Sequence, residues 1–271
     1  MKAMRWAVAI CGLILAREVA AAATPLSGVT INGESIAQMQ KRHPLGSAEV
    51  DDPVYKRKQR YEGIWLRDLL KDMSYAGHAE SDVYVRFRCK DGYAPIMPLA
   101  RALSGKGLLA VRDLNAPAGK SWELFSANGQ TSTPAPAYLV WASPGDIEEF
   151  PWPYQIVAIE LTTSADVLGA AMADDSRRPG FDLFVKHCLK CHAVNGVGGT
   201  FGPDLNIPCS VTEYWNPAFL GRFIADAGSI RAGTRMPGFQ SLTGAEIQAI
   251  IQYLEYMGGH KKAGAACPSG R

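Results

Sequence analysis

The segment Cys188-Leu189-Lys190-Cys191-His192 decides the fold of the part of the chain in which it lies. Two cysteines separated by two residues and followed directly by a histidine form the CxxCH pattern of c-type haem attachment. The two thiols are spaced to bond the two vinyl groups of one porphyrin, and the histidine is placed to bind the iron. The pattern therefore predicts one covalent haem c, held by Cys188 and Cys191 with His192 as a metal ligand.

Other roles for the two thiols stay open at this point. A structural zinc site would need a second ligand pair, for which Cys209 and His187 are available, although no second CxxC or HxxxH pattern follows. A thioredoxin-like redox pair needs a βαβ context, which the surrounding sequence does not provide. A plain disulfide or a chance match is the remaining alternative.

A second iron ligand is predicted in the segment Arg235-Met236-Pro237-Gly238-Phe239. A methionine thioether on a loop suits the sixth coordination position of haem iron, and His/Met ligation raises the reduction potential. Met257 and His260 are competing candidates. Met257 continues the apolar stripe of a helix, so it is more typical of a core position, and Met236 is the predicted ligand.

Residues 177–262 predict a small helical domain around the CxxCH pattern. The segment 179–187 has apolar residues at helical spacing, whereas 196–205 is too rich in glycine for a helix and predicts a loop. A second helix is expected from Pro217 to Ala227. The last helix should begin at Thr243, where Glu246 completes a capping box, and end at Gly258-Gly259.

This stretch resembles class I cytochrome c. The matching residues are Gly180, Phe184, Cys188, Cys191, His192, Gly202-Pro203-Asp204-Leu205, Met236-Pro237 and Tyr253-Leu254. The resemblance implies an all-α fold whose first and last helices cross at Gly180 and Tyr253. It also implies that the Pro203 carbonyl accepts a hydrogen bond from the ring N–H of His192, which orients the imidazole.

The amino terminus predicts export. Lys2 and Arg5 precede an apolar run from Trp6 to Ala16, and the segment 20–23 offers small residues for a signal peptidase. The run is shorter than the roughly 20 residues that a membrane span needs. We therefore expect residues 1–23 to be a signal peptide and the mature protein to be periplasmic, with no membrane span.

Cysteine usage agrees with an exported protein. Besides the CxxCH pair, Cys209 and Cys267 lie in the carboxy-terminal part, and Cys89 lies earlier in the chain. An oxidising compartment permits a disulfide between Cys209 and Cys267, which would tie the tail of residues 263–271 to the helical domain. This pairing is a hypothesis, and the sequence leaves it open.

Residues 24–163 predict a separate domain of mixed α+β type, joined to the helical domain by a linker over 164–176. Val83 to Arg88 alternates apolar and polar residues like a half-buried strand. Further strands are expected at 108–111, 137–141 and 154–161, and a short helix at 66–72. The predicted architecture is an α+β domain followed by an all-α cytochrome c domain.

The amino-terminal domain resembles the molybdopterin-binding domain of the sulfite oxidase type. The resemblance rests on Tyr61-Glu62-Gly63-Ile64-Trp65-Leu66-Arg67-Asp68-Leu69-Leu70, on Asp91-Gly92-Tyr93, on Leu108-Leu109-Ala110 before Asp113, and on Ile159-Glu160-Leu161. That family holds molybdenum through a cysteine upstream of the Tyr-Gly segment.

This chain departs from that pattern, because residues 24–60 contain no cysteine and Cys89 lies downstream on a predicted strand. A basic run from Lys56 to Arg60 could hold a pterin phosphate, but such a run is more typical of a solvated face. We therefore expect the fold without the molybdenum chemistry, no molybdopterin, and Cys89 as a buried structural residue.

Charge differs between the two parts. Residues 177–271 carry ten basic and six acidic side chains, whereas residues 24–176 carry fifteen basic and nineteen acidic ones. A basic rim around a haem edge steers acidic redox partners, and docking of the two domains on each other is the alternative explanation. The nearly neutral balance gives no footprint for nucleic acid.

Together these features predict a periplasmic monohaem cytochrome that transfers single electrons between a partner oxidoreductase, such as a dehydrogenase or another cytochrome, and a downstream acceptor. The amino-terminal domain is expected to dock the partner. The alternative is a molybdopterin-dependent oxidoreductase with the fused haem domain as its electron outlet, and a haem-based sensor is a third possibility.

Overall fold

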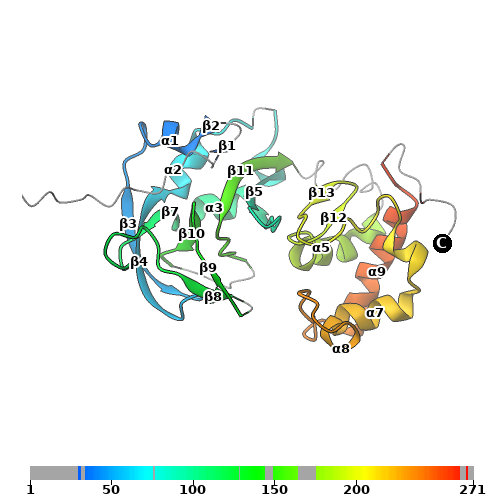
Figure 1. Cartoon of the computed structure of the whole chain (residues 1–271). Helices are drawn as coiled ribbons and strands as arrows, with labels where there is room; N and C mark the ends of the chain where they lie inside the picture. Colours follow the sequence, from blue (N-terminus) through cyan, green and yellow to red (C-terminus); the bar gives the residue numbers. More distant parts are fainter. Residues whose placement is uncertain are drawn as a thin grey trace, which may run out of the picture.

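The computed structural model describes residues 30–31, 34–75, 77–127, 129–143, 149–163, 175–262 and 267. Within them the chain forms two lobes, each with its own apolar core (Figure 1). The first core contains residues between Met39 and Ile159, and the second contains residues between Phe181 and Met257. The predicted signal peptide and most of the predicted linker lie outside the described residues.

The amino-terminal lobe is built on two sheets, which confirms the expected mixed α/β character. One sheet has the strand order β2-β1-β11-β5-β6 and the other has the order β10-β7-β4-β3. The strands of the first are β1 (Thr30–Ile31), β2 (Glu34–Ser35), β5 (Val83–Cys89), β6 (Ile96–Pro98) and β11 (Ile156–Thr163). Those of the second are β3 (Gly46–Asp52), β4 (Arg57–Trp65), β7 (Gly107–Asp113) and β10 (Tyr138–Trp141). The lobe also contains α1 (Ile36–Met39), α2 (Leu66–Lys71), η2 (Glu80–Asp82), α3 (Leu99–Ser104) and the ribbon of β8 (Phe125–Ala127) and β9 (Gln130–Ser132).

Strand β5 shows how the sequence pattern becomes structure. Its buried and more exposed residues alternate, because successive side chains of a strand point to opposite faces of the sheet. On the more open face Arg86 lies opposite Glu160 of β11 and pairs with it at 2.6 Å. Strand β11 begins at Ile156, two residues later than predicted, because Gln155 has φ 56° and leaves the extended conformation.

The sequence analysis did not predict strands β3 and β4 ahead of Tyr61. The two strands pair as a hairpin in which Val50 lies opposite Gln59. Gln59 is buried, whereas its charged neighbours on β4 are exposed, and Lys58 pairs with Asp51 at 3.2 Å. The basic side chains of the run from Lys56 to Arg60 are therefore exposed to solvent.

The carboxy-terminal lobe is helical, as predicted. It contains η4 (Asp175–Arg177), α5 (Arg178–His187), α6 (Val211–Tyr214), α7 (Pro217–Ala225), α8 (Ala227–Ile230) and α9 (Gly244–Gly258), with two short strands, β12 (Ala193–Val194) and β13 (Val197–Gly198). Helix α7 ends before the predicted Ala227, because Asp226 has φ −151° and its side chain caps α8 by accepting a hydrogen bond from the N–H of Ser229. Helix α6 was not predicted.

Helices α5 and α9 cross at the predicted pair of residues. A Cβ atom on Gly180 would lie 2.1 Å from the carbonyl oxygen of Ala249, so only glycine permits this approach. The ring of Tyr253 packs on Phe181 and Phe184 of α5. This crossing lies near the first turn of α5, and the CxxCH segment follows the other end of the helix.

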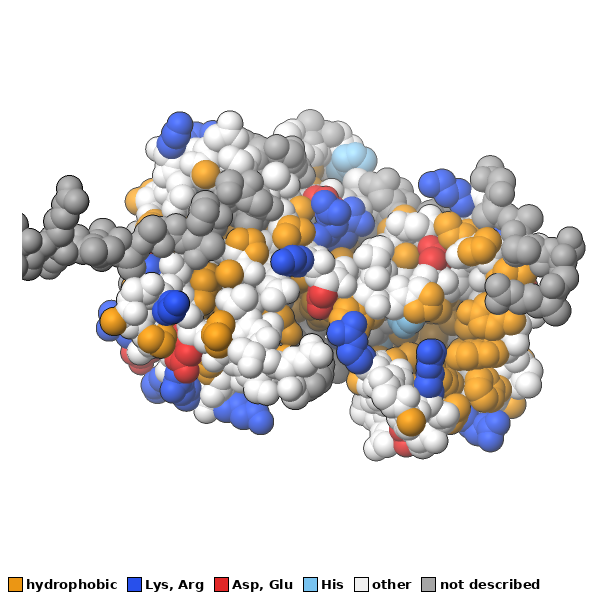
Figure 2. All heavy atoms as spheres, in the orientation of Figure 1, with side chains coloured by type: hydrophobic (Ala, Val, Ile, Leu, Met, Phe, Trp, Pro, Cys, Tyr) orange, Lys and Arg blue, Asp and Glu red, His pale blue; other side chains and the backbone are white. Residues whose placement is uncertain are grey.

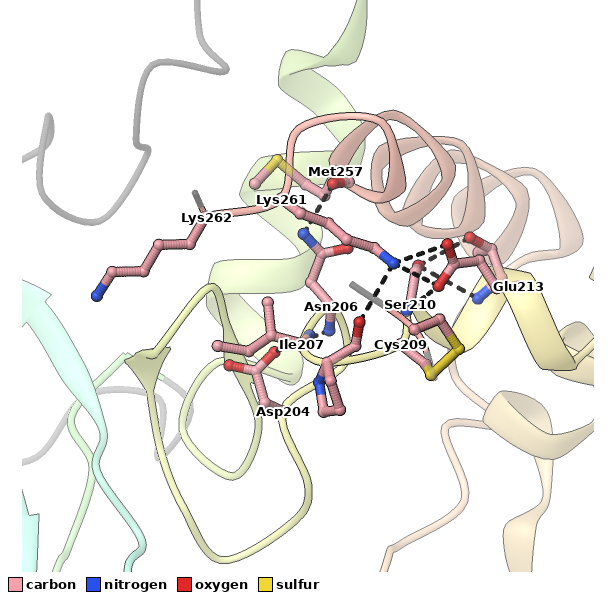
Figure 3. A network of polar contacts seen from close by, with 12 residues as sticks. Asp204, Asn206, Ile207, Cys209, Ser210, Glu213, Met257, Lys261 and Lys262 are labelled. Carbon is pink, nitrogen blue, oxygen red and sulfur yellow. Dashed lines mark hydrogen bonds and ion pairs between the residues drawn. A yellow bond between two sulfur atoms is a disulfide. The ribbon is translucent and has the colours of Figure 1, made fainter. Parts of the chain in front are cut away.

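The end of the described chain is tied back to the helical lobe. Cys209 and Cys267 form a disulfide with their Cα atoms 4.5 Å apart, which confirms the hypothesised pairing. Figure 3 shows the disulfide beside α6, where the ammonium of Lys261 contacts the two carboxylate oxygens of Glu213 at 2.7 and 2.6 Å. The hydrogen bond from Lys261 lowers the pKa of Glu213. One covalent bond and one ion pair therefore hold the segment that follows α9.

We expect Gly180→Ala to destabilise the helical lobe, because the added methyl group would overlap the Ala249 carbonyl and push α5 away from α9. Overpacking of this kind costs about 1–3 kcal/mol in the free energy of unfolding. Gly221→Ala in α7 is the matched control, since the nearest atom to its added Cβ is 3.6 Å away. Urea unfolding followed by circular dichroism measures both. A wild-type unfolding midpoint for Gly180→Ala would contradict the close crossing.

Replacing both Cys209 and Cys267 by serine should lower the free energy of unfolding by about 2–4 kcal/mol. The disulfide joins residues 58 apart in sequence and so restricts the unfolded chain. Thermal melts with and without a thiol reductant, at one fixed haem oxidation state, measure this effect. The reductant should bring the unsubstituted protein to the midpoint of the variant and leave the variant unchanged. Equal midpoints without reductant would show that the bond adds no stability.

Candidate haem site

The CxxCH segment forms a tight turn directly after α5. The backbone N–H groups of Cys191 and His192 both donate to the carbonyl of Cys188, at 3.0 and 2.9 Å. Neither cysteine of the turn takes part in a disulfide, which removes the plain-disulfide alternative in this structure. Burial raises the pKa of the Cys188 thiol to about 12 and raises the pKa of Cys191 as well. Both groups are therefore thiols at neutral pH.

The imidazole of His192 is fixed on one side by the backbone. Its Nδ1 atom lies 2.8 Å from the carbonyl oxygen of Pro203, the hydrogen bond that the resemblance to class I cytochrome c implies. Because a carbonyl only accepts, Nδ1 donates and Nε2 is the nitrogen left to bind a metal. Burial lowers the pKa of His192, which favours the neutral ring that metal binding requires.

The glycine-rich loop lies directly against the turn. A Cβ atom on Gly202 would be 2.5 Å from Cε1 of His192, so the bare backbone forms a cradle for the ring. Gly198 has φ 131°, and a Cβ atom there would lie 2.3 Å from the carbonyl oxygen of His192. The N–H of Gly199 donates to the carbonyl of Leu189 at 2.8 Å. The backbone of the loop therefore packs directly against the turn. Side chains at these glycine positions would prevent so close an approach.

Met236 lies on the loop between α8 and α9. Its side chain is half-buried and packs against the core of the helical lobe. Met257 is buried within α9 as part of that core. His260 is exposed, with Nδ1 2.8 Å from the carbonyl oxygen of Tyr256 and its ring stacked on the Tyr256 ring. Met236 differs from Met257 in lying on a loop, and from His260 in packing against the core of the lobe.

The structure does not bring together the residues of the alternative zinc site. Cys209 is bonded to Cys267 and cannot join Cys188 and Cys191 as a thiolate. Within the described ranges, one group of metal-binding side chains lies close together, namely Cys209, Glu213 and Cys267. Two of its three ligand atoms are the sulfurs of that disulfide, so the group is not a metal site while the bond is formed.

The CxxCH turn also lies against the amino-terminal lobe, a contact that the sequence analysis did not predict. The N–H of Ala94 donates to the carbonyl of Lys190 at 2.8 Å, and the N–H of Thr200 donates to the carbonyl of Gly92 at 2.8 Å. Ile96 of β6 packs against the core of the helical lobe. The turn between β5 and β6 is thus hydrogen-bonded to the haem attachment segment through main-chain atoms. Because every residue has these atoms, the sequence could not predict the contact.

A cavity of about 310 Å³ lies at this junction. It is lined by Cys89, Asp91, Tyr93, Trp152, Pro153 and Tyr154 of the amino-terminal lobe and by Cys191 and Phe201 of the helical lobe. Cys89 is buried, as predicted, and burial followed by the nearby Asp91 charge raises its pKa well above the usual range. It is therefore a thiol in the cavity wall.

These observations on the helical lobe fit covalent haem. It offers two free thiols at the right spacing, a neutral imidazole with a free Nε2, and a glycine cradle that a side chain would fill. The thioether of Met236 is a soft second donor. Histidine and methionine are both donors that haem iron accepts.

Comparison with known proteins agrees with this geometry. The model of the family described as cytochrome C oxidase, cbb3-type, subunit III matches residues 175–254. No curated protein matches the chain. Each helix in the described residues is too short or too polar to cross a membrane. The carboxy-terminal lobe contains a cytochrome c domain, and membership of that group of domains implies covalently bound haem c and a role in electron transfer.

Proposed function

We propose that this protein is a monohaem electron carrier. Cys188 and Cys191 hold the porphyrin, and His192 and Met236 ligate the iron. The observation that carries the proposal is the hydrogen bond of 2.8 Å between His192 Nδ1 and the Pro203 carbonyl beside two free thiols. The bound haem would supply a one-electron redox couple.

The protein side chains determine how that couple is used. Pro203 and the Gly202 backbone orient the imidazole and make it a better donor. Met236, as the second axial ligand, would leave no coordination position for a substrate and would favour the reduced state. Both effects support outer-sphere electron transfer rather than catalysis at the iron.

A periplasmic location and a redox protein as partner complete the proposal. Export rests on the signal pattern of residues 1–23. Basic side chains lie on both sides of the junction between the lobes (Figure 2). One of the basic side chains close to the turn is Arg235, which lies over the ring of Phe201 at 4.2 Å. Positive charge near the turn favours an acidic partner surface.

For the amino-terminal lobe we propose a sulfite oxidase-like fold that lacks the molybdenum chemistry. Two observations support this proposal. The segment from Tyr61 to Leu70, on which the resemblance rests, forms the end of strand β4 followed by helix α2. Cys89, the one cysteine of the lobe, is a buried thiol on β5 with a raised pKa.

Met236→Leu should abolish the His/Met low-spin spectrum and lower the reduction potential, because leucine keeps the apolar volume but removes the sulfur donor. Met257→Leu is the matched control, since it makes the same change in the core of α9 and should leave the spectrum and the potential unchanged. Absorption spectra and a spectroelectrochemical titration measure both. A wild-type spectrum in Met236→Leu would exclude it as the ligand, and a changed spectrum in Met257→Leu would assign that role to Met257.

Metal analysis separates the carrier from the molybdopterin enzyme. We expect one iron and no molybdenum per chain in protein made with intact haem-attachment machinery. One molybdenum per chain would support the alternative enzyme and would make Cys89 the first residue to substitute. Absence of iron, with a negative pyridine haemochrome assay, would contradict the proposed function itself.

A further inference from the structure

The covalent chemistry fixes where one edge of the porphyrin must lie. A thioether to Cys191 joins a former vinyl carbon directly to Sγ, so that edge lies within bonding distance of this residue. Cys191 is one of the two residues that the helical lobe contributes to the wall of the cavity between the lobes. The porphyrin edge next to this bond therefore faces the cavity.

The opposite wall of that cavity comes from the amino-terminal lobe and is largely aromatic, with Asp91 as its charged side chain. Tyr93 lies in the turn between β5 and β6, and Trp152 and Tyr154 precede β11. Both of the latter rings pack on Tyr138 in the core, with centroids 6.1 and 6.4 Å from its ring. The N–H of Lys90 donates to the carbonyl of Gln155 at 2.9 Å and joins the two segments. The wall is thus held by the packing of its own lobe.

We propose that the amino-terminal lobe forms the outer wall of the haem site, with Tyr93, Trp152 and Tyr154 facing the porphyrin edge bonded to Cys191. In this arrangement the lobe excludes water and partner proteins from that edge. The inference rests on the proposed haem attachment and adds to it a role for the amino-terminal lobe.

The contact between the lobes requires a particular residue at its closest point. Gly92 has φ 90°, and a Cβ atom there would lie 2.5 Å from Oγ1 of Thr200 and 2.9 Å from the backbone nitrogen of Phe201. Backbone meets backbone at this point, and the Gly92–Thr200 hydrogen bond forms there. A glycine is needed both for the conformation and for the approach. Close main-chain contact of this kind indicates that the two lobes pack in one defined arrangement.

The wall has a consequence for the reduction potential. Ferric haem carries one more positive charge than ferrous haem, and an apolar, water-free surrounding disfavours the more charged state. The aromatic side chains over the porphyrin edge therefore raise the potential, and the Asp91 carboxylate in the same wall acts in the opposite direction. The wall also directs electron exchange to other parts of the haem surface or through the amino-terminal lobe.

Gly92→Ala tests the wall in the full holo-protein. The methyl group should separate the lobes, shift the reduction potential and speed haem oxidation by ferricyanide. Gly77→Ala is the matched control: it places alanine at φ 88° in the same lobe, with nothing within 4 Å of the added Cβ, so it has the backbone strain without the overlap. Equal potentials and oxidation rates in the two variants would overturn the inference.

A second measurement needs no substitution. In the ferrous, diamagnetic protein, nuclear Overhauser effects should connect ring protons of Tyr93 or Trp152 with the porphyrin protons beside the Cys191 thioether. Absence of these effects would contradict the proposed wall, even if the Gly92→Ala variant fails to fold. The pyridine haemochrome assay on the same sample keeps the two proposals apart. A positive assay without these effects removes the wall and leaves the carrier, whereas a negative assay contradicts haem attachment.

Discussion

The hydrogen bond between the His192 ring and the Pro203 carbonyl is the contact on which the rest of the haem site depends. It selects which ring nitrogen is free, and the Gly202 backbone beneath the ring sets the direction in which that nitrogen points. The covalent attachment alone would leave the imidazole free to rotate. A neutral, oriented ring is what lets a one-electron centre change oxidation state without rearranging its ligands.

The same turn also joins the two lobes. The Ala94–Lys190 and Gly92–Thr200 hydrogen bonds attach the β5–β6 turn to the residues on either side of Cys191 and His192. The opposite charge of the two parts has two explanations, steering of a partner and docking of the domains. The observed contact includes main-chain bonds and packed side chains such as Ile96, and these do not depend on that charge difference.

The sequence predicts those features that local chemistry dictates. The CxxCH turn, the capping box of α9 and the alternation of β5 each follow from residues close together in the chain. Strands β3 and β4 were missed because charged residues occupy the exposed positions around buried Gln59, which hides the alternation. The Cys209–Cys267 bond stayed open because pairing depends on how the tail returns to α6. The contact between the lobes uses main-chain atoms, so no pattern of residue types in the sequence predicts it.

Cys89 bears on the proposed role of the amino-terminal lobe as a wall of the haem site. A molybdenum ligand must be a thiolate, and burial together with the charge of Asp91 disfavours ionisation of this thiol. Cys89 nevertheless lines the cavity, as do Tyr93 and Tyr154, on the side that faces Cys191. This largely apolar surface, in which Asp91 is the charged side chain, is suited to covering a porphyrin edge. In the proposed arrangement the lobe would influence the redox centre of its neighbour through packing.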